Sequence, residues 1–120
     1  MAAIANLTLD QGATFNSDVT VKDSNGNAFN LTGYTASAKM AKGYASTRTR
    51  TTITATVNGD PTTGIVTLSL TADETSALDG ERYLYDLEIL QTSTSTVTRV
   101  IEGIITVRPQ VSIYFTIFLL

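Results

Sequence analysis

Apolar and polar residues alternate through most of this chain, and the alternation predicts a series of short β-strands. Within residues 4–21, Phe15, Val19 and Val21 share one face, while polar residues occupy the other. A period of two is typical of a strand with one buried and one exposed face. The same pattern recurs along the chain. It predicts further inward-facing rows at Ala36, Ala38 and Met40; Ile53, Ala55 and Val57; Val66, Leu68 and Leu70; Tyr83, Tyr85, Leu87 and Ile89; and Ile101, Ile105 and Val107.

Turn-forming residues separate these rows. Asn25-Gly26 predicts a hairpin-type turn, and the Asn-Gly-Asp-Pro run at residues 58–61 predicts another. Gly12 lies where a kink would let the first strand change sheets. Residues 71–74 (Thr-Ala-Asp-Glu) form a capping box, in which the hydroxyl and the carboxylate satisfy first-turn amides. This motif predicts a single helical turn that ends near Leu78.

The spacing of these elements determines the predicted architecture. Short strands at regular turn spacing, with no long amphipathic helix, indicate a sandwich or a barrel. We predict an all-β fold, an immunoglobulin-like β-sandwich of about seven strands with one short helical turn and an apolar C-terminal extension. The sandwich would occupy residues 1–110, and residues 111–120 would form a C-terminal strand or arm. In one register Gly103 faces Tyr85, which leaves room for the tyrosine ring.

Composition limits the available chemistry. The 120 residues suffice for one domain with a two-layer core, and they include no Cys, His or Trp. Without Cys and His we expect no zinc or haem site, no Ser-His-Asp triad, no cofactor and no enzymatic activity. The net charge of −3 argues against a general nucleic-acid binder. The chain starts without a basic, apolar leader, and its apolar C-terminus is too short to span a bilayer. We therefore expect a soluble protein made in a cytoplasm, with no membrane partner.

Several stretches carry a resemblance to a known family. They are residues 7–15 (LTLDQGATF), 23–27 (DSNGN), 30–36 (NLTGYTA), 64–75 (GIVTLSLTADET), 83–88 (YLYDLE) and 102–109 (EGIITVRP). In order and spacing they resemble the small immunoglobulin-like domains of tailed-phage virion proteins, in particular the N-terminal domain family of the baseplate upper protein. The resemblance covers most of residues 5–110. It implies that the helical turn bridges two sheets.

The resemblance also implies a function. The protein would be a non-enzymatic structural component of a tailed-phage virion, made in the host cytoplasm, that docks on and stabilises a tail, baseplate or capsid scaffold. Its partners would be other virion proteins, and it would be a homo-oligomer or bound in an assembly. A capsid decoration (cement) protein is the alternative within this class. A carbohydrate- or receptor-binding module is an alternative from another class, although the lack of Trp and of an evident aromatic platform weighs against it.

A basic loop is the first candidate contact surface. Lys39, Lys42, Arg48 and Arg50 fall together, and residues 24–59 contain no Asp or Glu. One interpretation is a solvated loop. The other is a charged contact with an acidic patch on a neighbouring subunit. Nucleic acid is a distant third interpretation, because four cations and a single aromatic residue, Tyr44, make a poor binding surface.

The strands around residues 83–105 raise two more possibilities. If Tyr83, Tyr85 and Leu87 point inward, the outward residues are Leu84, Leu90, Val100 and Ile104, among Asp86, Glu88 and Glu102. A contiguous apolar group there would indicate an interface, although a one-residue bulge would turn some of these side chains inward. The Asp86 and Glu88 carboxylates are two apart on one strand, which is typical of a polar face and not of an acid pair across a cleft.

The loop at residues 23–27 has oxygen-bearing side chains at alternate positions, which also occur in calcium loops. However, its Gly is misplaced for an EF-hand, and Tyr34 stands where a bidentate Glu is needed. A turn stabilised by Asx hydrogen bonds is the favoured interpretation.

The C-terminal residues 111–120 (VSIYFTIFLL) would be largely apolar on both faces if extended. A strand that is apolar on both faces needs cover on both faces. Pro109 breaks the ladder just before this segment, which favours an arm that packs on a neighbouring subunit over a last core strand in its own domain. The predicted interface residues are Ile113, Tyr114, Phe115, Ile117, Phe118, Leu119 and Leu120.

Overall fold

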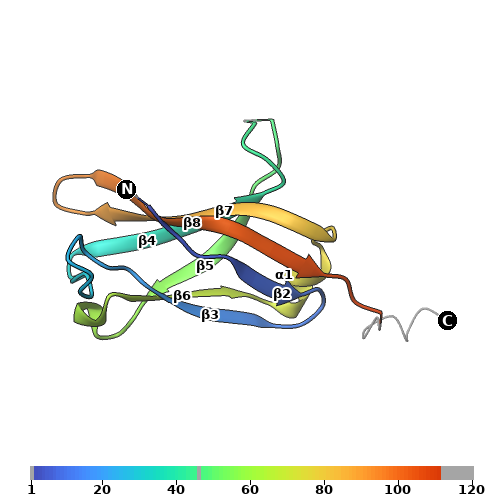
Figure 1. The fold of residues 1–120 in the computed structure, drawn as a ribbon, viewed down its shortest axis with the longest axis horizontal. Helices are drawn as coiled ribbons and strands as arrows, with labels where there is room; N and C mark the ends of the chain where they lie inside the picture. Colours follow the sequence, from blue (N-terminus) through green and yellow to red (C-terminus); the bar gives the residue numbers. More distant parts are fainter. Residues whose placement is uncertain (1, 46, 112–120) are drawn as a thin grey trace.

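The computed structural model describes residues 2–45 and 47–111. Within these residues the chain forms eight strands, one short α-helix and one 3₁₀ turn (Figure 1). In chain order they are β1 (Ala3–Ile4), β2 (Leu7–Asp10), β3 (Phe15–Thr20), β4 (Tyr34–Ala41), β5 (Thr51–Val57), η1 (Pro61–Thr63), β6 (Ile65–Leu70), α1 (Ala72–Ser76), β7 (Glu81–Gln91) and β8 (Thr96–Arg108).

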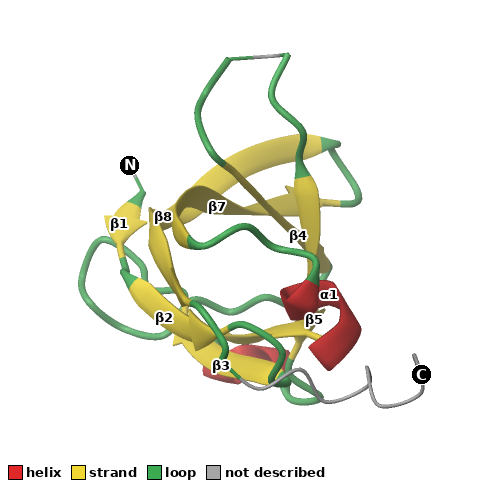
Figure 2. Cartoon of the chain, turned by 90° about the vertical axis from the view of Figure 1, so that its right-hand side faces the viewer, coloured by secondary structure: helices red, strands yellow, loops and turns green. Residues whose placement is uncertain are grey.

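The strands form a continuous, curled sheet whose two halves face each other. The hydrogen-bonded order is β1-β8-β7-β4-β5-β6-β3, and β2 also pairs with β8. Strand β5 joins the halves, because Thr51–Ile53 pair with β4 whereas Thr54–Val57 pair with β6. Figure 2 shows the sheet curled around its interior in an end-on view. The pairings β3·β6 and β4·β7·β8 are those of an immunoglobulin-like sandwich.

The predicted all-β sandwich with one short helical turn is therefore confirmed, with one refinement at the N-terminus. Residues 4–21 contain parts of three strands where one or two were expected, because the N-terminal chain adds the short β1 and then β2 to the edge of β8. The capping box forms as predicted: the Glu74 amide donates to Thr71 Oγ1 at 3.2 Å, and the Thr71 amide donates to Glu74 Oε1 at 2.8 Å.

The inward rows predicted from the alternation form the core. Every member of the rows on β3, β6 and β7 is buried, and on β8 Ile101, Ile105 and Val107 are buried as well. The neighbouring polar residues of β3 (Asn16, Asp18 and Thr20) are exposed. The rows on β4 and β5 are shallower at one end, where Ala36, Ala55 and Val57 are half-buried against the core.

Gly12 marks the point at which the chain changes sheets, as predicted. Strand β2 runs parallel to β8 and ends at Asp10, whereas β3 begins at Phe15 and pairs with β6. Gly12 has φ +86°, a value that residues with a Cβ rarely adopt. Its amide donates to the hydroxyl of Thr75 at 3.0 Å, and this hydroxyl in turn donates to the Ala13 carbonyl at 2.9 Å. The helix α1 therefore holds the crossover turn through one fully buried side chain.

We expect Thr75→Val to destabilise the protein by about 1–3 kcal/mol, because the half-buried Gly12 amide would lose its acceptor. Thr75→Ser is the matched control, since it keeps the hydroxyl and removes only a methyl group. Amide hydrogen exchange separates the two effects. The Gly12 amide should exchange much faster in the Val variant and stay protected in the Ser variant. Equal protection in both variants would contradict the assigned role of the hydroxyl.

Gly103 lies opposite Tyr85 in the β7·β8 ladder, which confirms the predicted register. The reason for a glycine there differs from the predicted one. A Cβ on Gly103 would overlap the backbone carbonyl of Ala5, and the next nearest atoms also belong to Ala5 and Asn6. The Tyr85 hydroxyl donates to the same Ala5 carbonyl. Gly103 therefore makes room for the N-terminal backbone, which Tyr85 then holds in place.

Tyr85 makes stability depend on pH in the alkaline range. Burial raises the pKa of Tyr85 from 10.0 to about 12. The folded state therefore retains the phenol proton between these two values, whereas the unfolded chain loses it. We expect the free energy of unfolding that Tyr85 contributes to be intact below pH 10 and to fall as the pH rises toward 12. Denaturant titrations across this range should show a smaller decline for Tyr85→Phe, and an identical decline would contradict the assignment.

Candidate functional site

The outer face of β4, β7 and β8 carries ordered rows of side chains. The register places Ala41, Leu84 and Ile104 side by side in an apolar row. Two residues further along each strand, Lys39, Asp86 and Glu102 form a charged row. Leu84, Leu90 and Ile104 are half-buried on this outer face, where the sequence placed them. The apolar members are therefore not scattered, because Leu84 and Ile104 are direct cross-strand neighbours.

A bulge in β8 explains the position of Val100, the remaining residue that was predicted to point outward. The β7·β8 register shifts between Leu87 and Glu88, which pair with Ile101 and Arg99. Val100 is left between these pairs and packs against the core. The one-residue bulge, which was the alternative considered from the sequence, thus turns Val100 inward and brings Arg99 onto the outer face.

The outer face is hollowed into a groove of about 640 Å³, which we name the outer groove. Strands β4, β7 and β8 form its floor, Gly43, Tyr44 and Arg50 of the loop after β4 form one wall, and Ile4 of strand β1 borders the other side. Figure 2 shows this loop standing above the sheet, and β1 lying beside β8 at its edge. Two large apolar side chains stand on the walls: Tyr44 is 80% exposed and Ile4 is 68% exposed.

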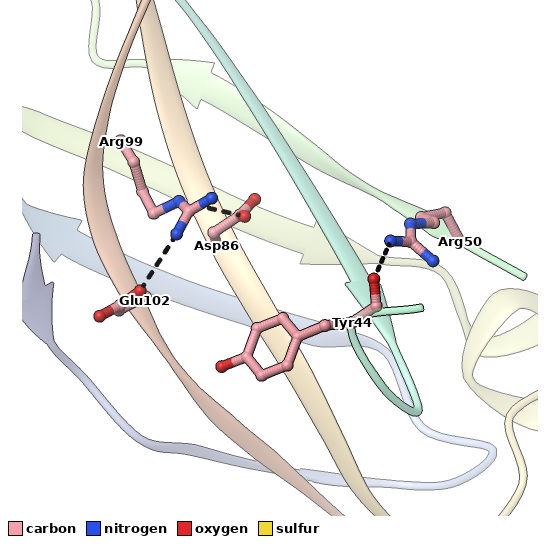
Figure 3. A network of polar contacts seen from close by, with 5 residues as sticks. All are labelled: Tyr44, Arg50, Asp86, Arg99 and Glu102. Carbon is pink, nitrogen blue, oxygen red and sulfur yellow. Dashed lines mark hydrogen bonds and ion pairs between the residues drawn. The ribbon is translucent and has the colours of Figure 1, made fainter. Parts of the chain in front are cut away.

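Arg50 shapes the loop that carries Tyr44. Its guanidinium donates to three backbone carbonyls of the loop: those of Ala45 at 2.8 Å, Arg48 at 2.9 Å and Tyr44 at 3.2 Å. A planar guanidinium presents several donors in a fixed geometry, which suits it to bridge converging carbonyls. In Figure 3 the Arg50 contact to the Tyr44 carbonyl is drawn, and the Tyr44 ring points from the loop toward the strands that carry Asp86 and Glu102.

Arg99 organises the floor of the outer groove. Its Nε lies 3.4 Å from Asp86 Oδ2, and its Nη1 lies 3.5 Å from Glu102 Oε1 (Figure 3). Half of the Arg99 side chain is exposed, so these ion pairs are screened by water and contribute little to stability. Their effect is to fix the positions of two carboxylates and one guanidinium that face the same open space.

The basic loop uses its four predicted cations in different ways. Arg50 holds the loop backbone, and Lys42 Nζ donates to the Gly80 carbonyl at 2.6 Å while lying 4.6 Å from the centre of the Tyr83 ring. Both are therefore engaged within the chain. Lys39 and Arg48 are exposed, and no hydrogen bond or ion pair joins the Arg48 side chain to another residue of the described ranges. Arg48 is the loop cation that remains best placed for an external contact.

The loop at residues 23–27 forms the favoured Asx turn. Asp23 Oδ1 accepts hydrogen bonds from the amides of Asn25 at 2.9 Å and Asn27 at 3.0 Å. The carboxylate therefore serves the turn itself. Within the described parts of the chain, no group of three or more acidic residues could hold a metal ion. No helix in those parts is long and apolar enough to cross a membrane.

The predicted C-terminal interface residues Ile113, Tyr114, Phe115, Ile117, Phe118, Leu119 and Leu120 lie outside the described residues. Sequence reasoning did not find the outer groove. The available signal was Tyr44, a single aromatic residue in an otherwise polar loop, but the strands that face it come from residues 37–41, 84–88 and 99–104. Searches with this chain found no matching protein-family model and no curated protein that matches it.

Proposed function

We propose that this protein is a non-enzymatic structural component of a tailed-phage virion, which docks on a tail, baseplate or capsid scaffold and stabilises it. The resemblance over residues 5–110 carries the proposal. In support, the resembling stretches fall on the framework of the sandwich: the turn at Gly12 joins the sheets, and the capping box starts the helix between β6 and β7. Gly103 lies beneath the N-terminal segment.

The sheet offers a physical means of docking at its two ends. Within the described residues, β2 pairs only with β8 and β3 pairs only with β6, so each strand has one open edge. A second groove of about 260 Å³ lies between these edges and is lined by residues of both strands. Open edges can accept a strand from a neighbouring subunit through backbone hydrogen bonds. Strand addition of this kind would fix a small domain on a scaffold without any catalytic group.

Electron microscopy of particles tests this proposal and locates the protein. Antibodies against residues 2–111 would be applied, with gold labels, to purified particles of the phage that encodes the chain. Labels at the tail or its tip would support the tail and baseplate assignment, and labels spread over the head would support the capsid decoration alternative. Particles without label, together with absence of the protein from their mass spectra, would refute a virion role.

The basic loop supplies a second test of docking. If Arg48 contacts an acidic neighbour, Arg48→Ser should weaken incorporation at low salt, and the deficit should shrink at high salt because exposed charges are screened over roughly 10 Å at 0.1 M. Arg50→Ser is the comparison variant. It removes the three carbonyl contacts and should alter the loop itself, which amide NMR spectra would reveal. Normal incorporation of Arg48→Ser at low salt would leave the loop as a solvated surface.

A further inference from the structure

We propose that the outer groove binds a neutral oligosaccharide. This would be a function beyond docking on a particle, and it does not depend on the virion proposal. The inference starts from Tyr44, a residue that is 80% exposed although its own carbonyl is held by Arg50. A large aromatic ring on a fixed backbone, directed over a groove, is an apolar surface that lacks a partner within the described chain. It supplies the aromatic contact that the sequence alone did not reveal.

The charges of the outer groove favour a ligand without net charge. The lining includes three carboxylates, from Asp86, Glu88 and Glu102, and three cations, from Lys39, Arg50 and Arg99. These formal charges cancel, so neither an anionic nor a cationic ligand is favoured by the summed field. A strongly basic peptide or a nucleic acid would meet as much repulsion as attraction.

The same side chains suit a ligand rich in hydroxyl groups. Carboxylates only accept hydrogen bonds, whereas ammonium and guanidinium groups only donate them. A sugar hydroxyl does both, so it can bridge the acids and bases that alternate on the floor. Arg99 lies 3.4 Å from Asp86 and 3.5 Å from Glu102, so a donor group and two acceptor groups are gathered on one surface.

The apolar parts of the outer groove match the other half of a sugar. A pyranose ring has one face of C–H groups, which carry slight positive charge and pack on the negative face of an aromatic ring. Tyr44 offers such a face, and Leu84, Ile104 and Ile4 provide aliphatic surface beside it. The volume of the outer groove, about 640 Å³, lies in the range of sites for small ligands.

Amide NMR spectra of the full chain, titrated with trisaccharides of glucose, N-acetylglucosamine, galactose and mannose at millimolar concentration, test the inference. We expect at least one of them to shift, saturably, the signals of residues 43–45, 84–88 and 99–104. Tyr44→Ala should lower that affinity roughly tenfold or more, as for buried aromatic contacts in other binding sites. Tyr44→Phe should retain most of the affinity. Val97→Ala removes another exposed apolar side chain, which is not part of this lining, and should leave the affinity nearly unchanged.

Several results would overturn the inference. They are the absence of saturable shifts with all four sugars, shifts outside the named segments, affinity that survives Tyr44→Ala, and preferential binding of a Lys-rich peptide by the same residues. Shifts of those residues that depend on protein concentration alone would instead make the outer groove a contact between copies of the chain, and this too would refute the sugar assignment. Spectra of Tyr44→Ala away from the loop serve as the check on folding.

Discussion

Replacing Leu87 by Ala should destabilise the protein by about 2–5 kcal/mol, measured by denaturant unfolding. Leu87 is fully buried on β7, between Ala38 of β4 and Ile101 of β8 in the ladder. Truncation of its side chain leaves a cavity in the interior between the two facing halves of the sheet. The neighbouring strands on both sides fix the backbone of β7 and limit the collapse of this cavity.

Two further variants make the Leu87 result interpretable. Leu68→Ala, on the opposite half of the sheet, should cost a similar amount, since Leu68 is also fully buried. Val97→Ala is the surface control, because Val97 is 57% exposed, and it should change stability by no more than about 0.5 kcal/mol. Small losses of stability in both variants would mean that the inward-facing rows are not tightly packed and contribute little to the stability of the fold.

Truncation after Gln110 should leave a folded, more soluble monomer that no longer assembles. Residues 111–120 are apolar on both faces when drawn as a strand, and each large side chain would contribute roughly 1.5–3 kcal/mol when buried against a neighbour. The inward rows of the described sandwich already pack against one another, so the expected source of further cover is another subunit. Sedimentation velocity and circular dichroism of the two chain lengths measure association and folding separately.

The alternative outcomes of this truncation are distinct. Unfolding of the shortened chain would mean that residues 111–120 belong to the core of their own domain. Normal assembly of the shortened chain would mean that they are dispensable. The matched control is a full-length chain with Phe115→Ser and Phe118→Ser, which keeps the length but reduces the apolar surface. It should lose assembly as the truncation does.

Local signals in the sequence were sufficient for much of the framework. The alternation identified the inner residues of β3, β6 and β7, because a period of two survives wherever one face is buried. The Thr71–Glu74 capping box located α1 for a similar reason, since its hydrogen bonds join residues three apart. Gly12 indicated the change of sheets because a glycine within a strand pattern marks a kink, and its φ of +86° agrees with this prediction.

Features that depend on contacts between distant segments were not predictable in this way. Alternation within β5 is uniform, so it gives no sign that Ile53 pairs with β4 while Ala55 pairs with β6. Gly103 was placed correctly opposite Tyr85, but the approach of Ala5 from the far end of the chain explains it. The outer groove likewise exists because Gly43, Tyr44 and Arg50 lie beside strands from the second half of the sequence.

The parallel pairing of β2 with β8 has a mechanical consequence. Residues 7–10 run beside residues 105–108 in the same direction, so the two ends of the domain leave this pair at opposite ends. A force that pulls the ends apart would load these hydrogen bonds along the strands, and all of them would have to fail together. An antiparallel pair pulled from one end would instead open bond by bond. We therefore expect the domain to resist tension applied along these strands, a property set by strand direction and independent of any ligand.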